Sequence, residues 1–358
     1  CRACHYRLND NERLKAVKYY REVAHEPANK TVSFTLNELY ARPRLAELVE
    51  EFLKAKKAGI VELKTFINHQ LALPWDDKHE AVDPDSMIDR LGTYAGRVPD
   101  GVLFITAGVD VQDTYLAVEV VGWNRHRSWS LDYRTFQGVP SHNAPVWQQL
   151  DAYLAKQWPS EYGFTMRVNT CFIDSGGHFT DAVYQFCAGR RTRAIYPVKG
   201  SSFAAQPLAA KSSSKHHGCT LWIAGTDTAK DLIYAYLNVQ DPKSPGYCHF
   251  SAPHNNDDYF RQLTAEELKP VYKNGQWVNQ WRNKPGVRNE ALDCRVYALA
   301  ALEAANVDWP SFEQALEAIQ AKGPTPSPTP LPTTHTAPKA VGQTSHVPMG
   351  GYRLRKRG

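Results

Sequence analysis

Three aspartates lie in segments whose other residues are largely apolar. Asp110 and Asp174 lie near the ends of two β-rich runs, and Asp293 lies in the first turns of an alanine- and leucine-rich stretch. An isolated ionised carboxylate is very costly to bury in an apolar core. Three carboxylates can share such a core if they surround cations, and Mg²⁺ and Mn²⁺ prefer hard oxygen ligands of this kind. The three aspartates therefore indicate a site for divalent metal ions.

The chemistry expected of such a site is phosphodiester hydrolysis. Two of these ions about 4 Å apart activate water and stabilise the leaving oxygen. Carboxylates at two adjacent strand ends, with a third from a helix that crosses the sheet, would provide this geometry in a ribonuclease-H-like arrangement. Glu290 lies one turn before Asp293 on the same helix face and is a further candidate ligand.

Each aspartate also has a purely structural explanation. A single Asp at a strand end is most often a turn former or a helix cap. Asp113 fits this explanation better than Asp110, because residues 112–114 are the turn itself. Spacing alone leaves both explanations open for each of the three residues.

The elements that must position these residues alternate between strands and helices. Short polar turns join three predicted strands, Val102–Val111, Leu116–Trp123 and Ser128–Phe136. Further along we expect helices over 144–157, Thr180–Cys187 and Asn289–Ala305, and strands over Val168–Asp174 and Arg193–Val198. We expect a loop over residues 200–220, which are rich in Ser, Ala and Lys, and short strands and loops over 221–285. This alternation predicts an α/β fold with a mixed central sheet flanked by helices.

The composition divides the chain into three parts. Residues 1–100 are mostly charged, are interrupted by prolines and have a helical pattern, which predicts a helical connecting subdomain. Residues 101–310 contain the three aspartates and form the predicted catalytic domain. Residues 320–358 begin with alternating prolines and end in a basic tail, which is typical of an extended or disordered linker with a docking peptide. A disordered tail without a partner explains the same residues.

The overall composition is that of an ordinary soluble globular protein. The chain has 358 residues, of which 42% are hydrophobic and 22% charged, and its formal charge of +5 permits a nucleic-acid partner without requiring one. Its seven cysteines are odd in number and irregular in spacing, which favours a reducing compartment over a disulfide framework. We find no signal peptide and no membrane-spanning run, and the start at Cys1 is typical of a fragment or a processed piece.

Several short motifs carry a family resemblance by their order and number. They resemble the lambda-like bacteriophage terminase large subunits, over roughly residues 1–305. The motifs are Leu63-Lys-Thr-Phe-Ile-Asn68 with Pro74-Trp75, Ala107-Gly-Val-Asp-Val-Gln-Asp113, Val120-Val-Gly-Trp123, Ile173-Asp-Ser-Gly-Gly-His178, Ala182-Val-Tyr184, Val198-Lys-Gly200 and Arg288-Asn-Glu-Ala-Leu-Asp-Cys-Arg-Val-Tyr297.

The resemblance implies an activity, a cofactor and partners. Terminase large subunits join a packaging ATPase to a ribonuclease-H-like endonuclease that cuts concatemeric double-stranded DNA in the host cytoplasm. Asp110, Asp174 and Asp293 would hold two Mg²⁺ or Mn²⁺ ions in residues 101–310, and the partners would be DNA, the terminase small subunit and the capsid portal protein. The sequence has no phosphate-binding loop of the ATPase type, so we expect no ATPase module and no DNA translocation. Cys1 and Cys4 resemble the last cysteine pair of the family, but a structural zinc needs four ligands.

Other residues near the aspartates have a functional and a structural explanation each. His178 is a candidate general base, phosphate contact or metal neighbour, or else a helix-start or surface residue. Lys199 is a candidate phosphate contact or a solvated lysine. A basic stretch offers a DNA-backbone track or an ordinary charged surface, and its members are Arg190, Arg191, Arg193, Lys199, Lys211, Lys215, His216 and His217. Arg288 and Arg295 flank Asp293 and could neutralise the acidic site or bind DNA.

Two other classes of protein fit the same residues. One is another ribonuclease-H-like nuclease, such as a transposase or a junction resolvase, which would prefer transposon ends or four-way junctions. The other is a non-catalytic module that docks on DNA or on the portal and cleaves nothing. The order of the motifs favours the terminase interpretation over both.

Overall fold

A nine-stranded mixed sheet forms the centre of the described part of the chain. The computed structural model describes residues 9–16, 37–40, 44–73, 82–94, 97–160, 163–203, 206–216, 218–273 and 275–321. The strand order is β1 (Leu91–Gly92), β11 (Cys248–Ser251), β4 (Ser128–Gln137), β3 (Tyr115–Trp123), β2 (Phe104–Val111), β7 (Thr170–Asp174), β8 (Ile195–Ser201), β10 (Cys219–Gly225) and β9 (Ala209–His216).

The middle of this sheet combines a meander with parallel strands. Strands β2, β3 and β4 are antiparallel neighbours, whereas β7 and β8 run parallel to β2 on its other side. The order β4-β3-β2-β7-β8 is that of the ribonuclease-H-like fold. The predicted fold class and the predicted meander are therefore confirmed.

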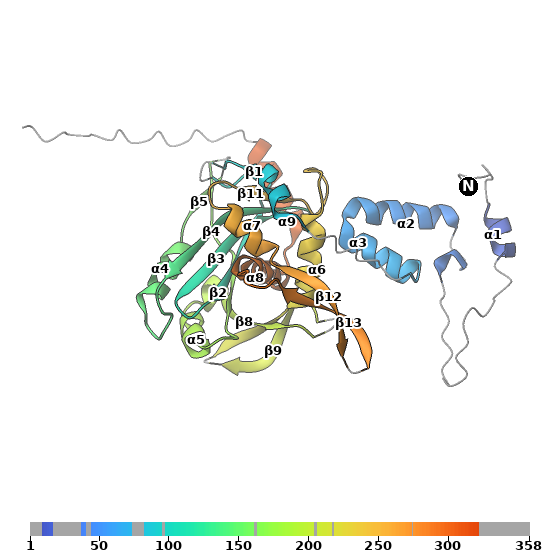
Figure 1. Cartoon of the computed structure of the whole chain (residues 1–358). Helices are drawn as coiled ribbons and strands as arrows, with labels where there is room; N and C mark the ends of the chain where they lie inside the picture. The colour runs from blue at the N-terminus through green and yellow to red at the C-terminus, as the bar shows by residue number, and fades with distance from the viewer. Residues whose placement is uncertain are drawn as a thin grey trace, which may run out of the picture. The chain divides into compact units, whose positions relative to one another are not determined.

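Helices cover both faces of the sheet (Figure 1). Helices α4 (Pro145–Leu154) and α5 (Thr180–Ala188) pack on one face. Helices α6 (Thr226–Leu237), α7 (Asp257–Leu263) and α8 (Glu290–Ala305) pack on the other. The remaining elements are short hairpins and peripheral helices: β5 (Trp158–Pro159) with β6 (Thr165–Met166), β12 (Glu266–Lys273) with β13 (Gln276–Asn283), α9 (Trp309–Ala321), and, toward the amino terminus, α1 (Asp10–Ala16), α2 (Leu45–Ala58), α3 (Ile60–Thr65) and η3 (Pro84–Arg90).

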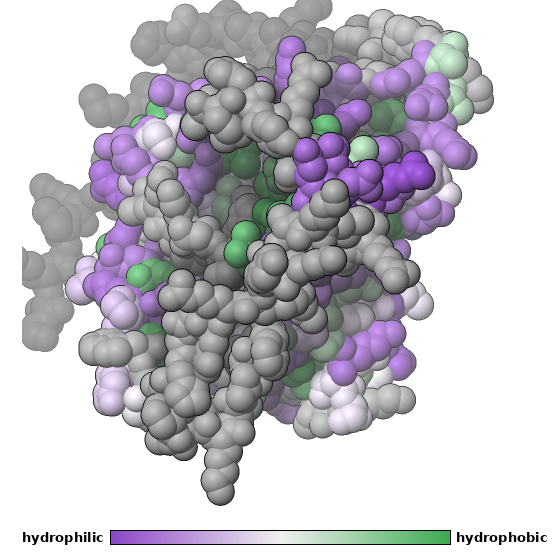
Figure 2. Space-filling model, turned by 90° about the vertical axis from the view of Figure 1, so that its right-hand side faces the viewer, coloured by the Kyte–Doolittle hydropathy of each residue, from purple (hydrophilic) through white to green (hydrophobic). Residues whose placement is uncertain are grey.

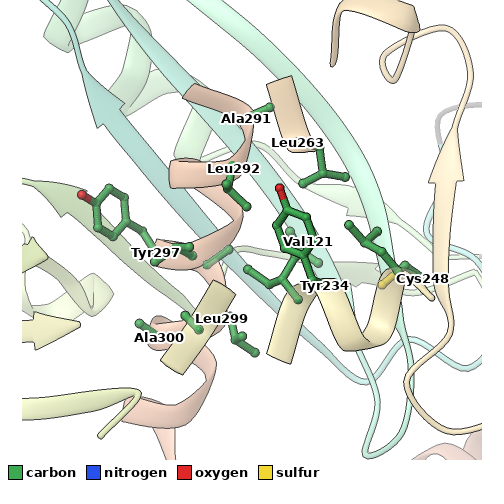
Figure 3. Close-up of a cluster of buried hydrophobic side chains, with 14 of the residues drawn as sticks. Val121, Tyr234, Cys248, Leu263, Ala291, Leu292, Tyr297, Leu299 and Ala300 are labelled. Carbon is green, nitrogen blue, oxygen red and sulfur yellow. The ribbon is translucent and has the colours of Figure 1, made fainter. Parts of the chain in front are cut away.

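Helix α8 is buried on nearly all sides, as its alanine- and leucine-rich sequence predicts. Its residues share a hydrophobic core with strands β3 and β11 and with helices α6 and α7, through Val121, Cys248, Tyr234 and Leu263 among others. Figure 3 shows Leu292 and Leu299 of α8 within this cluster, while Tyr297 leaves the helix on the side away from Tyr234.

On the face that Figure 2 shows, hydrophilic residues dominate the described surface, and hydrophobic residues are visible mainly in the recesses between them. None of the described helices is both long enough and apolar enough to cross a membrane.

A buried ion pair fixes α8 to the sheet. Arg295 donates to both carboxylate oxygens of Glu119 on β3, at 3.0 and 2.6 Å, and to the Tyr259 hydroxyl oxygen at 3.1 Å. Arg295 is 2% exposed and Glu119 is fully buried. The removal of one partner from such a pair costs about 3–5 kcal/mol, because the other charge stays buried. The expectation that Arg295 neutralises the acidic site or binds DNA is therefore wrong.

The prediction of a loop over residues 200–220 is also wrong in its second half. Residues 209–216 form strand β9 and residues 219–225 form strand β10. Strand β9 lies at the edge of the sheet, where Lys and Ser are common because they discourage pairing with other chains. The composition of residues 209–216 favours a loop, but the segment forms a strand because it pairs at the edge of the sheet. Helices α6, α7 and α9 were missed as well.

The division into three parts stays a prediction. The alternating prolines and the basic tail lie outside the described residues, as do Cys1, Cys4, Pro74 and Trp75. Helix α9 continues the described chain to Ala321, beyond the predicted end of the catalytic domain at residue 310.

A substitution at Gly108 tests how closely α8 must approach the sheet. A Cβ at this position would lie 1.9 Å from the Cys294 carbonyl oxygen and 2.6 Å from the Ala298 nitrogen, both of them backbone atoms of α8. We expect Gly108→Ala to lower the free energy of unfolding by at least about 3 kcal/mol, since overpacking usually costs about 1–3 kcal/mol even where side chains can adjust. Urea denaturation measures this change.

The matched control is Gly189→Ala. Gly189 has a φ of −77°, and a Cβ there would meet nothing within 4 Å. We expect this variant to change the free energy of unfolding by no more than about 1 kcal/mol. Equal stabilities of the two variants would contradict the close packing of α8 at Gly108.

Candidate metal centre

Strand register brings Asp110 and Asp174 to the same level of the sheet. Strands β2 and β7 are parallel, and Val109 lies opposite Ile173, so that Asp110 and Asp174 are the next residues along both strands. Side chains alternate between the two faces of a sheet. Val109 and Ile173 belong to the core under α4 and α5, so the two aspartates face the opposite side, where α8 lies.

Helix α8 brings the third aspartate to the same place. The contact of Gly108 with the Cys294 carbonyl shows that α8 crosses β2 two residues before Asp110. Asp293 directly precedes Cys294, and Thr106 on the same face of β2 donates its hydroxyl to the Ala298 carbonyl at 2.9 Å. The structure therefore brings together the three aspartates that the sequence singles out, from β2, β7 and α8.

Burial and mutual repulsion oppose the ionisation of this group. Asp110 is 5% exposed. Burial raises its pKa to about 7, the charges of Asp174 and Glu290 act in the same direction, and the hydrogen bond from Gln112 acts in the opposite direction. Burial also raises the pKa of Asp293 well above its usual value, assisted by the charge of Asp110. The three carboxyl groups are close enough for each to resist the charge of the others.

Asp174 has more polar support than the other two. Burial raises its pKa, whereas hydrogen bonds from the Gly176 backbone and from the Tyr297 hydroxyl lower it, as does the charge of Lys199. The Gly176 amide donates to its Oδ1 at 3.0 Å. Asp174 is therefore the carboxylate most readily held in its charged form, and Lys199 lies close enough to Asp174 to affect it.

A second polar network holds Asp293 in place. Asn289 donates through Nδ2 to Asp293 Oδ2 at 3.1 Å and to Glu266 Oε1 at 3.1 Å. The buried Lys230 ammonium bonds both oxygens of Glu266 at 2.7 Å, and its charge lowers the pKa of Asp293. This network connects α6, β12 and α8 behind the aspartate.

The carboxylate groups near one another in this region are of the type that hard divalent cations prefer as ligands. Asp110, Asp174, Asp293 and the nearby Glu290 offer only carboxylate oxygens, and one oxygen of Glu290 is buried without a hydrogen bond from the described residues. Within those residues no three acidic, His or Cys side chains converge tightly enough to enclose an ion. The charges of these carboxylates raise the pKa values of Asp110 and Asp293, and a bound cation would offset their repulsion.

His178 lies beside the site but is bound to Asp113. Its Nδ1 lies 2.8 Å from Asp113 Oδ1, and both side chains are exposed. The hydrogen bond to Asp113 raises the pKa of His178. This contact joins the turn after β2 to the loop after β7, so His178 as placed connects the two loops, and its predicted catalytic role stays a prediction.

The predicted DNA-binding arginines have protein partners. Arg190 and Arg193 both bond Asp151 of α4, with contacts of 2.7 and 2.5 Å to Oδ1. Arg191 donates to the Gly218 carbonyl at 2.9 Å, and Arg288 donates to Asp258 at 2.8 Å. Lys199 alone of the predicted DNA contacts lies beside an aspartate of the site. The side chains of Lys215 and His216, and all of His217, lie outside the described residues.

The sequence interpretation missed the residues that support Asp174 and Asp293. Asn289, Asp293 and Tyr297 are four residues apart, which places them on one face of a helix, so their spacing was a usable signal. Lys230 and Glu266 gave no such signal, because they meet only when α6 and β12 pack together. Gly108 belongs to the motif of residues 107–113, but only the structure shows that it is a contact point for α8.

The fold defines a ribonuclease-H-like protein in which three aspartates lie close together on one face of the sheet. A family model described as the endonuclease domain of terminase large subunit gpA matches residues 31–314. The chain is 32% identical over 274 residues to the terminase large subunit of Escherichia phage lambda, and 32% identical over 257 residues to that of Enterobacteria phage P21. The chain therefore belongs to the family of phage terminase large subunits, to the part that holds their endonuclease domain.

The matches cover different shares of the proteins compared. The lambda match covers 74% of this chain and 42% of the relative, and the P21 match covers 69% and 40%, so the chain spans about two fifths of these relatives. A solved large terminase from a thermophilic bacteriophage matches with 10% identity and a TM-score of 0.37, over 61% of this chain and 43% of that one. A mutant nuclease domain of the large terminase subunit gp2 of bacterial virus Sf6, with manganese, matches with 10% identity and a TM-score of 0.35, over 61% and 94%.

The raised pKa of Asp110 predicts how the stability of the metal-free protein depends on pH. An unfolded Asp has a pKa of about 3.9, whereas Asp110 in the fold has a pKa of about 7. Between these values the folded chain keeps a proton that the unfolded chain releases, so this contribution to stability falls as pH rises from about 4 to about 7. We expect Asp110→Asn in EDTA to melt at a higher temperature than the parent at pH 8, with a smaller difference at pH 5.

Thermal unfolding followed by circular dichroism at both pH values measures this effect. Asp257→Asn, which removes an exposed carboxylate of α7, is the control and should follow the parent. A pH dependence of Asp110→Asn equal to that of the parent would show that Asp110 ionises as it does in the unfolded chain.

Proposed function

We propose that this chain is a metal-dependent endodeoxyribonuclease that cuts double-stranded phage DNA during packaging. The observation that carries the proposal is the convergence of Asp110, Asp174 and Asp293 in the domain that matches the terminase endonuclease family. Concatemeric DNA as substrate, and the small subunit and the portal as partners, follow from the resemblance of the motifs to that family.

The three aspartates would hold two Mg²⁺ or Mn²⁺ ions. When bound, the ions would activate water and stabilise charge on the attacking and leaving oxygens of the phosphodiester. Asp110 on β2 lies next to Asp174 on β7, and α8, which carries Asp293, crosses β2 near Asp110. Tyr297 and the Gly176 amide orient Asp174, and Asn289 orients Asp293.

Lys199 would contact the phosphate backbone of the DNA. It lies at the end of the parallel strand next to Asp174, and its charge lowers the pKa of that residue. A lysine acts on phosphate as a point charge and does not need a fixed geometry. His178 and Arg288 are further candidates for contact with DNA, because both side chains are exposed beside the site. Arg190, Arg191 and Arg193 would contribute only where DNA competes with their present partners.

A plasmid assay tests the proposed activity. We expect the chain to convert supercoiled plasmid to nicked and linear forms in Mn²⁺ or Mg²⁺, and to leave it intact in EDTA. Asp174→Ala should lose at least about 100-fold in rate, since the metal site would be incomplete. Gel electrophoresis over time measures the rate, and circular dichroism verifies that the variant is folded. A folded parent that cuts nothing with either metal would favour a docking module instead.

The salt dependence of DNA binding tests whether Lys199 contributes more to binding than other basic residues do. We expect Lys199→Ala to weaken binding of a short duplex in EDTA and to reduce the slope of log K against log salt by about 1, because one phosphate contact is lost. Arg190→Ala should change the slope less, since Arg190 bonds Asp151. Lys243→Ala, in the turn before β11, is a control far along the chain from the aspartates. Fluorescence anisotropy measures all three, and equal slopes for Lys199→Ala and Lys243→Ala would contradict the role of Lys199.

A further inference from the structure

Glu290 is a buried carboxylate with one oxygen unused. It is 6% exposed and is the first residue of α8. Its Oε1 accepts a hydrogen bond from the Tyr115 hydroxyl at 2.7 Å, whereas Oε2 is out of contact with solvent and accepts no hydrogen bond from the described residues. A buried carboxylate oxygen without a partner carries the full cost of its desolvation. Its position therefore needs an explanation other than the stability of the fold.

Glu290 lies next to the three aspartates. Residues three apart in a helix share a face, so Glu290 and Asp293 lie on the same side of α8. The charge of Glu290 raises the pKa of Asp110, which shows that these two carboxyl groups also lie close together. The nearby cation Arg288 bonds Asp258 at 2.8 Å, and the charge of Glu290 raises the pKa of this arginine. The unused oxygen thus lies beside carboxylates that already repel one another.

Tyr115 holds Glu290 in this position. Burial and the hydrogen bond to Glu290 raise the pKa of Tyr115 to about 12, so the hydroxyl keeps its proton and remains a donor at neutral pH. Tyr115 begins β3, directly after the turn that follows Asp110. The same turn therefore places Asp110 and the residue that orients Glu290.

We propose that Glu290 is a fourth carboxylate ligand of the metal centre, with Oε2 as the ligand atom and Tyr115 as the positioning residue. The inference rests on the proposed function, because it needs a divalent cation among Asp110, Asp174 and Asp293. A cation there supplies the partner that Oε2 lacks and screens the repulsion between Glu290 and Asp110.

Mn²⁺ binding to the whole chain, measured by isothermal titration calorimetry without DNA, tests the inference. Glu290→Gln removes the charge but keeps an oxygen that accepts from Tyr115. We expect it to weaken Mn²⁺ binding at least about tenfold or to remove one equivalent of bound Mn²⁺, and Tyr115→Phe to weaken binding by a smaller factor. Asp258→Asn, which removes an exposed carboxylate of α7, should bind Mn²⁺ as the parent does.

Thermal stability tests the inference independently, because Glu290→Gln should weaken Mn²⁺ binding but stabilise the metal-free protein. Because Glu290 adds a carboxylate close to Asp110, Glu290→Gln in EDTA should melt at a higher temperature than the parent, and Mn²⁺ should raise its melting temperature by less. A residue that serves only packing would give a lower melting temperature in EDTA and an unchanged shift with Mn²⁺. That second pattern would overturn the inference.

Asp174→Ala separates this inference from the proposed function. Parent-like Mn²⁺ binding in Glu290→Gln, together with lost binding in Asp174→Ala, would overturn the role of Glu290 and leave the metal centre in place. Parent-like binding in both variants would overturn both. Weak binding in Glu290→Gln alone would keep Glu290 as a ligand and remove Asp174 from the site. If Glu290→Gln does not fold, unchanged Mn²⁺ binding in Tyr115→Phe would overturn the inference.

Discussion

The site depends on the contact between α8 and β2 at Gly108. Only a residue without a side chain lets the helix backbone approach the strand so closely, and this approach sets Asp293 beside Asp110. The buried pair of Arg295 with Glu119 fixes the rotation of the helix about its axis at the same place. The position of α8 along the strand and its rotation are thus both fixed by residues that directly follow Asp293, namely Cys294 and Arg295.

This placement concentrates negative charge in a region that water reaches poorly. The raised pKa values of Asp110, Asp174 and Asp293 are the consequence. A protein selected for stability alone would separate these groups, and strained arrangements of this kind persist where function requires them. The stable strands of the meander and the large core around α8 offset this cost, so the charged site does not unfold the domain.

Much of this site could be predicted from the sequence, because a carboxylate in an apolar segment stands out whatever the fold. Asp110 and Asp174 end β-rich runs, and the helix around Asp293 is apolar on almost every side. The network of Lys230 and Glu266 could not be predicted, since the two residues are 36 positions apart and meet through tertiary packing. Strand β9 was missed because its serines and lysines are typical of loops as well as of sheet edges. Local pattern therefore identified the three carboxylates that the fold brings together, whereas their supporting partners depended on the fold.

The separation of charges around α8 keeps Arg295 away from the aspartates. Arg295 follows Asp293 by two residues, which is a rotation of about 200° around the helix, so the two side chains lie on opposite sides of it. The arginine is thereby committed to Glu119 and cannot reach the aspartates. Lys230 faces Asp293 but is held by both oxygens of Glu266. Arg295 and Lys230 are thus both held by glutamates, and Lys199 on β8 is the lysine whose charge acts on Asp174.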